Sequence, residues 1–75
     1  MNRVILRFYV VKDKDVFEII FDTRLSFEEN FKLLKDIYRD FTNFIVFDPD
    51  RRMALKKTIP LAHFNFINFM TLYLF

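Results

Sequence analysis

The chain has 75 residues, of which 53% are hydrophobic, and a formal net charge of +2. A chain of this length forms one domain at most, taken here as residues 1–75. It contains no Cys and no Gly, which excludes disulfides, thiolate metal sites, glycine-rich phosphate loops and a diglycine conjugation tail. The net charge is too small to predict nucleic-acid binding.

The first two predicted elements are strands. Residues 3–11 and 16–22 each alternate apolar and other side chains with a period of two, which is typical of half-buried strands. Residues 12–15 are all charged and link the two runs. Asp can adopt left-handed backbone angles, which helps a turn that lacks Gly. Two alternating runs with a short polar link predict a β-hairpin.

A helix is predicted after the hairpin, over residues 27–40. Ser26 and Glu29 form an S-x-x-E capping box, in which each side chain bonds the backbone N–H of the other residue. Apolar residues then recur at helical spacing. The inner face of this helix is expected to contain Phe27, Phe31, Leu34, Ile37, Tyr38 and Phe41.

The second half of the chain predicts shorter elements. We expect a strand at residues 43–48, a turn at 48–50, and a short strand at 53–57. Pro at a first helical position predicts a helical turn at residues 60–64. Alternation returns at residues 71–75 and predicts the last strand.

This order of elements predicts an α+β domain, with a mixed sheet and one helix packed across one face. Three segments carry a resemblance to the β-grasp fold of ubiquitin-like proteins. Residues 61–66 (LAHFNF) resemble the Leu-x-x-Tyr-Asn-Ile motif of that family, and residues 71–74 (TLYL) resemble its last strand at the same spacing. Residues 44–47 (FIVF) resemble its preceding strand. The resemblance is one of packing and therefore concerns the fold.

A second resemblance is to a subfamily. Residues 16–26 resemble the second strand and the start of the helix in the small bacterial YukD/EsaB proteins. Those proteins are ubiquitin-like, have no glycine tail, and are associated with type VII secretion systems of Gram-positive bacteria. The resemblance implies a cytoplasmic, non-enzymatic accessory or regulatory protein that can pair with itself. Arg3 and Arg7 interrupt any apolar region of a signal peptide, in agreement with a cytoplasmic protein.

The alternative interpretation is a small membrane-attached protein. Residues 58–75 contain no charged side chain and could form a C-terminal hydrophobic anchor. Pro60, His63, Asn65 and Asn68 lie within this segment, and polar side chains without partners are costly to bury in hydrocarbon. We therefore expect a strand and no membrane span.

Few residues suggest chemistry. Ser26 is the only Ser and His63 the only His, and Ser26 is already expected to cap the helix. A metal site would need further ligands near His63, so we expect no enzyme activity, metal or cofactor. Basic residues cluster at 51–52 and 56–57. An RNA-binding role for this cluster is the weaker alternative to a solvated surface.

The expected functional surface is the face of the sheet opposite the helix. If the other strand residues face the helix, this open face exposes many apolar and aromatic side chains, which mark interaction sites. Ubiquitin-like domains generally bind partners through this face. The predicted contact residues, for a protein partner or a second copy of the chain, are Ile5, Arg7, Tyr9, Ile20, Val46, Tyr73 and Phe75.

Overall fold

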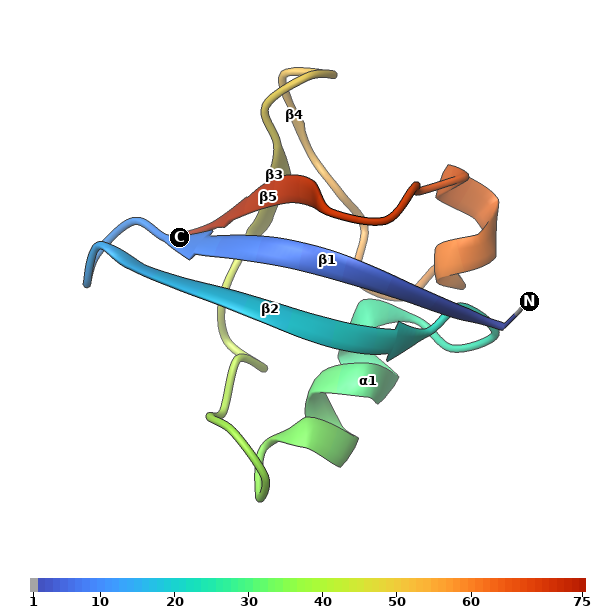
Figure 1. The fold of residues 1–75 in the computed structure, drawn as a ribbon, viewed down its shortest axis with the longest axis horizontal. Helices are drawn as coiled ribbons and strands as arrows, with labels where there is room; N and C mark the ends of the chain where they lie inside the picture. The colour runs from blue at the N-terminus through green and yellow to red at the C-terminus, as the bar shows by residue number, and fades with distance from the viewer. Residues whose placement is uncertain (1) are drawn as a thin grey trace.

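A computed structural model describes residues 2–75 and contains one α-helix, one short 3-10 helix and five strands within them (Figure 1). The elements in chain order are β1 (Arg3–Val10), β2 (Asp15–Asp22), α1 (Phe27–Leu34), β3 (Val46–Asp48), β4 (Met53–Ala54), η1 (Leu61–Phe64) and β5 (Met70–Leu74). The first hairpin and the last strand agree with the sequence prediction to within one residue at each end.

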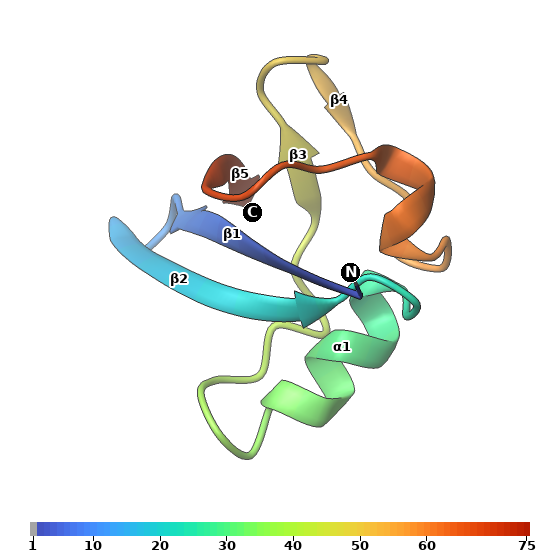
Figure 2. The same cartoon turned by 45° about the vertical axis from the view of Figure 1, so that its right-hand side comes forward.

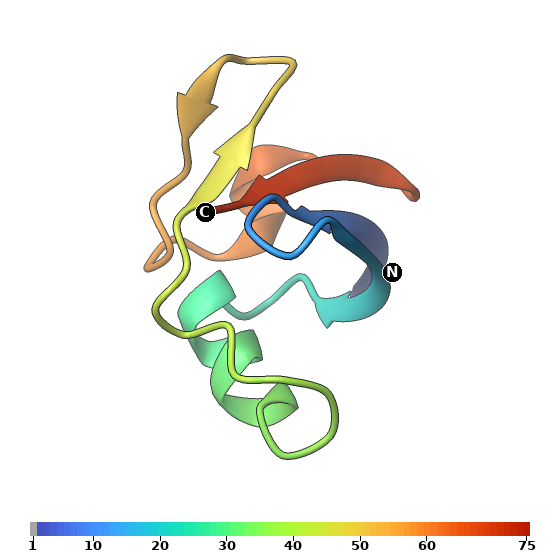
Figure 3. The same cartoon turned by 90° about the vertical axis from the view of Figure 1, so that its left-hand side faces the viewer.

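The strands form one mixed sheet in the order β2-β1-β5-β3-β4. β1 and β5 are parallel, and the pairs β1–β2, β3–β5 and β3–β4 are antiparallel. Helix α1 lies on one side of the sheet, and the β3–β4 hairpin extends away from it (Figures 2 and 3). The prediction of an α+β fold with one helix across one face of a mixed sheet is confirmed.

Helix α1 begins as predicted. The Ser26 hydroxyl accepts a hydrogen bond from Glu29 N–H, and the Glu29 carboxylate accepts one from Ser26 N–H, each at 3.1 Å. Both bonds of the capping box therefore form, and Ser26 is fixed as the N-cap of the helix.

The helix ends at Leu34, six residues before the predicted end at residue 40. The N–H groups of Ile37 and Tyr38 both bond to the Leu34 carbonyl, which closes the helix in a tight turn. Ile37 and Tyr38 are 73% and 55% exposed, so their expected place on the inner face is wrong. The early end lets the chain return Phe41 to the core, where its ring lies 5.8 Å from that of Phe31.

The second hairpin is shorter than predicted. β3 begins at Val46, although Ile45 already exchanges two backbone hydrogen bonds with Phe75, of 2.8 and 2.9 Å. β4 has only two residues because the chain then leaves the sheet. The carbonyl of Lys57 accepts from Glu28 N–H at the start of α1, and its side chain donates to the Thr42 carbonyl. Leu55 N–H still donates to the Val46 carbonyl of β3 at 2.8 Å, and the chain then turns to the helix side at Lys57.

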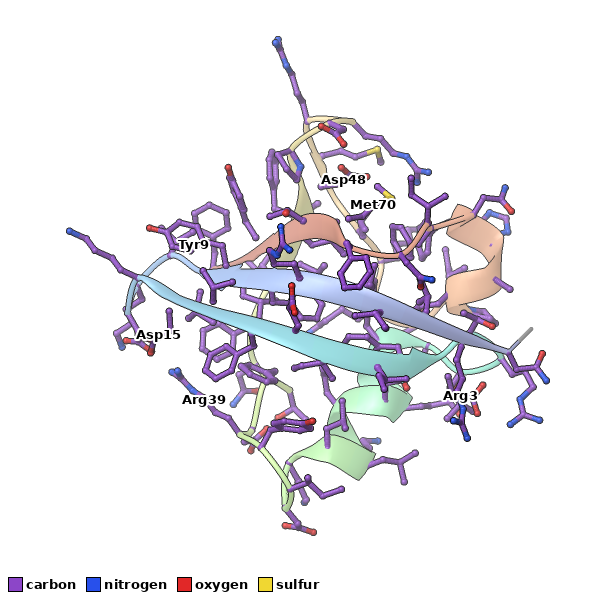
Figure 4. All side chains as sticks on the ribbon, in the orientation of Figure 1. Arg3, Tyr9, Asp15, Arg39, Asp48 and Met70 are labelled. Atoms are coloured by element: carbon purple, nitrogen blue, oxygen red, sulfur yellow. The ribbon has the colours of Figure 1, made fainter. Side chains whose placement is uncertain are left out.

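A buried carboxylate holds the turn between β3 and β4. Asp48 is labelled in Figure 4 near β3 and β4. It is fully buried, and its Oδ1 accepts from the N–H groups of Asp50 and Arg51. Its Oδ2 has no hydrogen bond within residues 2–75 and lies 3.4 Å from Arg51 Nε. The Arg51 guanidinium also donates to the Phe64 carbonyl at 2.6 Å, which ties this turn to η1.

The core between the sheet and α1 is built mainly from phenylalanine. Rings from β1, β2, α1 and the following loop pack with centroid distances of 5.3–6.1 Å, and all are fully buried: Phe8, Phe21, Phe27, Phe31 and Phe41. All of these contacts are edge-on or tilted, which suits the quadrupoles of the rings. The large aromatic volume lets a chain of this length fill a core.

The uncharged C-terminal segment is part of this architecture. Residues 61–64 form η1 behind Pro60, as predicted, and β5 lies between β1 and β3 inside the sheet. Leu72 and Leu74 of β5 are fully buried. Within residues 2–75, no helix is long and apolar enough to cross a membrane.

Candidate functional site: the open face of the sheet

The face of the sheet opposite α1 carries every second side chain of each strand. Along β1, Val4, Leu6, Phe8 and Val10 are buried, whereas Ile5, Arg7 and Tyr9 between them are half-buried. The pairing register then places residues of neighbouring strands side by side on this open face. One row runs across four strands, as Val16–Tyr9–Tyr73–Phe47.

Four aromatic rings form a connected strip on the open face. The Tyr9 and Tyr73 rings meet edge-on with centroids 5.7 Å apart. Tyr73 lies 6.4 Å from Phe75, which in turn lies 6.0 Å from Phe47. We call Tyr9, Tyr73, Phe75 and Phe47 the aromatic strip. It spans β1, β5, β3 and the residue after β5, so only tertiary pairing brings its members together.

An ion pair lies beside the aromatic strip. Arg7 donates from Nε and from Nη2 to Glu18 Oε2, at 3.1 and 2.7 Å. Arg7 and Glu18 are opposite one another in the β1–β2 register, and both side chains are more than two-fifths exposed. Such an exposed pair contributes about 0–1 kcal/mol to stability. The pair also holds the Arg7 guanidinium and the Glu18 carboxylate in place in the middle of the open face.

A shallow depression lies at the other end of the open face. It holds about 170 Å³ and is lined by Arg3, Val4, Ile5, Ile20 and Asn68. Ile5 and Ile20 are directly opposite in the register, and Ile20 is 56% exposed. The Asn68 side chain accepts a hydrogen bond from Ile5 N–H at 3.0 Å, which fixes the rim. The depression could take one apolar side chain of a bound molecule.

The structure brings six of the seven predicted contact residues to this face and corrects the seventh. Val46 is fully buried and pairs with the buried Leu74. Val46 and Asp48 lie two residues apart in β3, so their side chains point to the same side of the sheet. Both are buried, Asp48 because its carboxylate accepts the N–H groups of the turn. Phe47 occupies the open face instead and was missed.

Val16 and Ile45 are further exposed apolar residues that the sequence prediction missed. Val16 is 58% exposed and lies opposite Tyr9. Ile45 is 55% exposed and pairs with Phe75 through the backbone. The alternation of residues 15–22 could have indicated Val16. Nothing in the sequence indicated Ile45, because residues 44–47 are apolar without a break.

The residues considered for chemistry are not assembled into a site. Ser26 is 2% exposed, and its hydroxyl is used by the helix cap. His63 is exposed on η1, with its ring edge-on to Phe64. Among residues 2–75, no group of three or more His, Cys, Asp or Glu side chains could hold a metal ion.

The basic cluster is partly used inside the fold. Arg51 binds Asp48 and the Phe64 carbonyl, and its guanidinium lies 5.9 Å from the centre of the Phe66 ring. The Lys57 ammonium donates to the Thr42 carbonyl at 2.7 Å. Two of the four cations therefore have structural partners within residues 2–75. Arg52 and Lys56 are the other two, and two positive charges are few for an RNA-binding surface.

The strand order, the parallel β1–β5 pair and the single helix define a ubiquitin-like β-grasp fold. The chain is similar to a solved structure described as a protein designed de novo on the basis of ubiquitin. The similarity has a TM-score of 0.73 at 15% sequence identity, and covers 99% of this chain and 88% of that one. No protein-family model matches the sequence, and no curated protein matches it.

Proposed function

We propose that residues 1–75 act as a single ubiquitin-like domain without enzymatic activity, which binds a protein through the open face of its sheet. The observation that carries this proposal is the aromatic strip at one end of the open face, together with the depression at Ile5 and Ile20 at its other end. Ring edges and half-exposed aliphatic side chains lie on strands that the core holds rigidly. Rigid aromatic surface of this kind provides binding energy at small entropic cost.

The experiment compares Tyr73→Glu with a matched control on the other layer of the molecule. Leu33 on α1 is 63% exposed, so Leu33→Glu introduces the same charge away from the open face. We expect the wild type and Leu33→Glu to recover the same cross-linked proteins from native extracts, and Tyr73→Glu to lose them. Ile20→Glu should act like Tyr73→Glu.

Two results would contradict the proposal. One is a folded Tyr73→Glu variant that recovers the same proteins as the wild type. The other is a partner lost equally in Leu33→Glu. Circular dichroism of each variant shows whether it is folded. Light scattering of the purified chain, with and without Tyr73→Glu, tests whether the partner is a second copy, as a homodimer through this face requires.

We further propose a cytoplasmic accessory role in a bacterial type VII secretion system. Support comes from the resemblance of residues 16–26 to YukD/EsaB proteins, a segment that forms β2 and the capped start of α1. Deleting the coding sequence should then reduce export by that system, and a complementing copy with Tyr73→Glu should not restore it. Unchanged export in the deletion strain would exclude this role while leaving the protein-binding proposal intact.

A further inference from the structure

Strand β2 lies at one border of the sheet and is paired on one side only. All eight of its residues pair with β1, and no strand of residues 2–75 lies beyond it. Figures 1 and 2 show β2 along this free border. A long border strand presents main-chain donors and acceptors that another extended chain can pair with.

The contacts of Asn30 show which main-chain groups of β2 point outward. Its side-chain amide accepts from Asp22 N–H and donates to the Asp22 carbonyl, at 3.0 and 3.1 Å. Asn30 is 4% exposed and thus covers the last outward position of the strand in the way a neighbouring strand would. The next residue, Thr23, bonds to the Asn2 carbonyl on the β1 side.

Main-chain groups alternate in direction along a strand, so Val16, Glu18 and Ile20 point outward as Asp22 does. Within residues 2–75, no hydrogen bond joins the N–H or C=O groups of these three residues to another group. Three donor–acceptor sets therefore lie in line along about 13 Å of border, at about 3.3 Å per residue.

The border of β2 has few of the features that keep sheet edges apart. The opposite border strand, β4, has only two residues. β2 has eight, pairs with β1 without a bulge, and contains no Pro, Lys or Arg. Short strands, bulges, Pro and Lys are the usual means of preventing strand addition. The only charge in the middle of this border is Glu18.

The side chains of the border indicate the chemistry of what binds there. Val16 and Ile20 are 58% and 56% exposed and flank Glu18. Arg7 bonds Oε2 of Glu18, and no hydrogen bond within residues 2–75 reaches Oε1. All the ionisable side chains of β2 are acidic: Asp15, Glu18 and Asp22. A second copy of β2 would bring like charges together, whereas a basic strand would be complementary.

We propose that the outer border of β2 binds an extended basic segment of another protein by antiparallel strand addition. A Lys or Arg of that segment lies opposite Glu18, and apolar residues two positions away on either side lie opposite Val16 and Ile20. Main-chain hydrogen bonds supply the affinity, and these three side-chain pairs supply the specificity. This site shares Ile20 with the depression of the open face but contains no residue of the aromatic strip, so Tyr73 is the residue that distinguishes the two proposals.

The probe is the capped peptide acetyl-Thr-Val-Thr-Lys-Thr-Val-Thr-amide, titrated into the full chain and followed by amide NMR shifts at low salt. We expect shifts centred on the amides of Val16, Glu18 and Ile20, together with slower hydrogen exchange of these amides. Replacing the peptide Lys by Glu should weaken binding about three- to tenfold. Methylating the main-chain nitrogen of the peptide Lys should weaken it similarly, because the donor opposite Glu18 is lost.

A pair of variants tests the main chain of β2 itself. Val16→Pro removes one outward N–H but no β1–β2 hydrogen bond, whereas Val16→Thr keeps the N–H with a similar shape. We expect Val16→Pro to bind the peptide about two- to tenfold more weakly than Val16→Thr. Tyr73→Glu should bind the peptide as the wild type does, which separates this site from the open-face proposal.

Several results would overturn the proposal. They are no amide shifts at millimolar peptide, equal binding of the Lys and Glu peptides, or loss of binding in Tyr73→Glu. A folded Val16→Pro variant that equals Val16→Thr would also do so. If Val16→Pro does not fold, the N-methylated peptide gives the same test on the unaltered protein. Concentration-dependent shifts of the Val16 and Ile20 amides without peptide would indicate pairing between copies and would also overturn it.

Discussion

The β1–β2 hairpin pairs eight residues on each strand, whereas the β3–β4 hairpin pairs two. The first hairpin presents an unbroken apolar face to α1 and is held by many equivalent contacts. The second extends away from the helix and depends on a few particular groups, chiefly the buried Asp48 and its contact with Arg51. Long, periodic hairpins distribute their stability over many residues. Short ones concentrate it in single side chains.

The largest expected difference between the hairpins comes from truncating one phenylalanine in each. Phe8 is fully buried and its ring contacts three other core rings, so Phe8→Ala should cost about 3–5 kcal/mol. Phe47 of β3 is half-buried on the open face, and Phe47→Ala should cost about 1 kcal/mol. Urea denaturation of both variants measures the two free energies of unfolding. Equal losses would show that the open face contributes as much as the core.

The next comparison replaces one Asp in each hairpin turn. Asp48→Ala leaves two turn N–H groups without an acceptor and should cost about 2 kcal/mol. Asp13 in the first turn pairs with Arg39 across partly exposed side chains, so Asp13→Ala should cost less than about 1 kcal/mol. Thermal unfolding gives the comparison. Asp48→Asn, which keeps an acceptor oxygen, should lose less than Asp48→Ala, and an equal loss would show that the contact with Arg51 dominates.

A smaller effect, a gain in stability, is expected from changing a feature that the two hairpins share. Both turns contain a long basic residue in the left-handed region, Lys14 with φ 56° and Arg52 with φ 55°. Asn tolerates this region better than residues with long side chains. Lys14→Asn and Arg52→Asn should each raise the free energy of unfolding by about 0.5–1 kcal/mol. A loss of stability in either variant would reveal a contact of that side chain important for the fold.

The smallest effect concerns the far end of the first hairpin. Hydrogen bonds from the Arg24 side chain and backbone lower the pKa of Asp22 from 3.8 to about 2. The folded state therefore favours the ionised carboxylate, and this contribution is complete above about pH 3.8 and is lost as the pH falls toward 2. Thermal midpoints measured from pH 5 to pH 2 should fall less steeply for Asp22→Asn than for the wild type. Parallel curves would show that the Asp22–Arg24 pair does not contribute to folding.

The first hairpin and the start of α1 could be predicted because their signals are local. Alternation over eight residues fixes which side of β2 is buried, and the capping box from Ser26 to Glu29 fixes where the helix begins. Residues 35–40 could not be predicted in the same way. Their apolar residues have helical spacing, so the local pattern favours a longer helix. Packing of Phe41 on Phe31 and Phe17 stabilises the fold more than another helical turn would.

Some residues of the candidate site could likewise be predicted from local pattern, and others could not. The alternation of residues 3–11 placed Ile5, Arg7 and Tyr9 on one face, and the structure brings them together there. Local pattern could not place Val46, because residues 44–47 are all apolar and show no alternation. The buried side of β3 is fixed by the folded turn, whose two N–H groups allow the Asp48 carboxylate to be buried. The free border of β2 was not predicted either, because which strand lies at a border depends on the order of strands in space.

The sequence by itself determined the number and type of the main elements, the two ends of the first hairpin, and the start of the helix. These features follow from period, capping and turn chemistry, which act between residues close in the chain. Tertiary structure alone decided where the helix ends, which face of β3 is buried, and which rings form the aromatic strip. Each of these depends on contacts between distant segments, whose free energy outweighs the weaker local preferences.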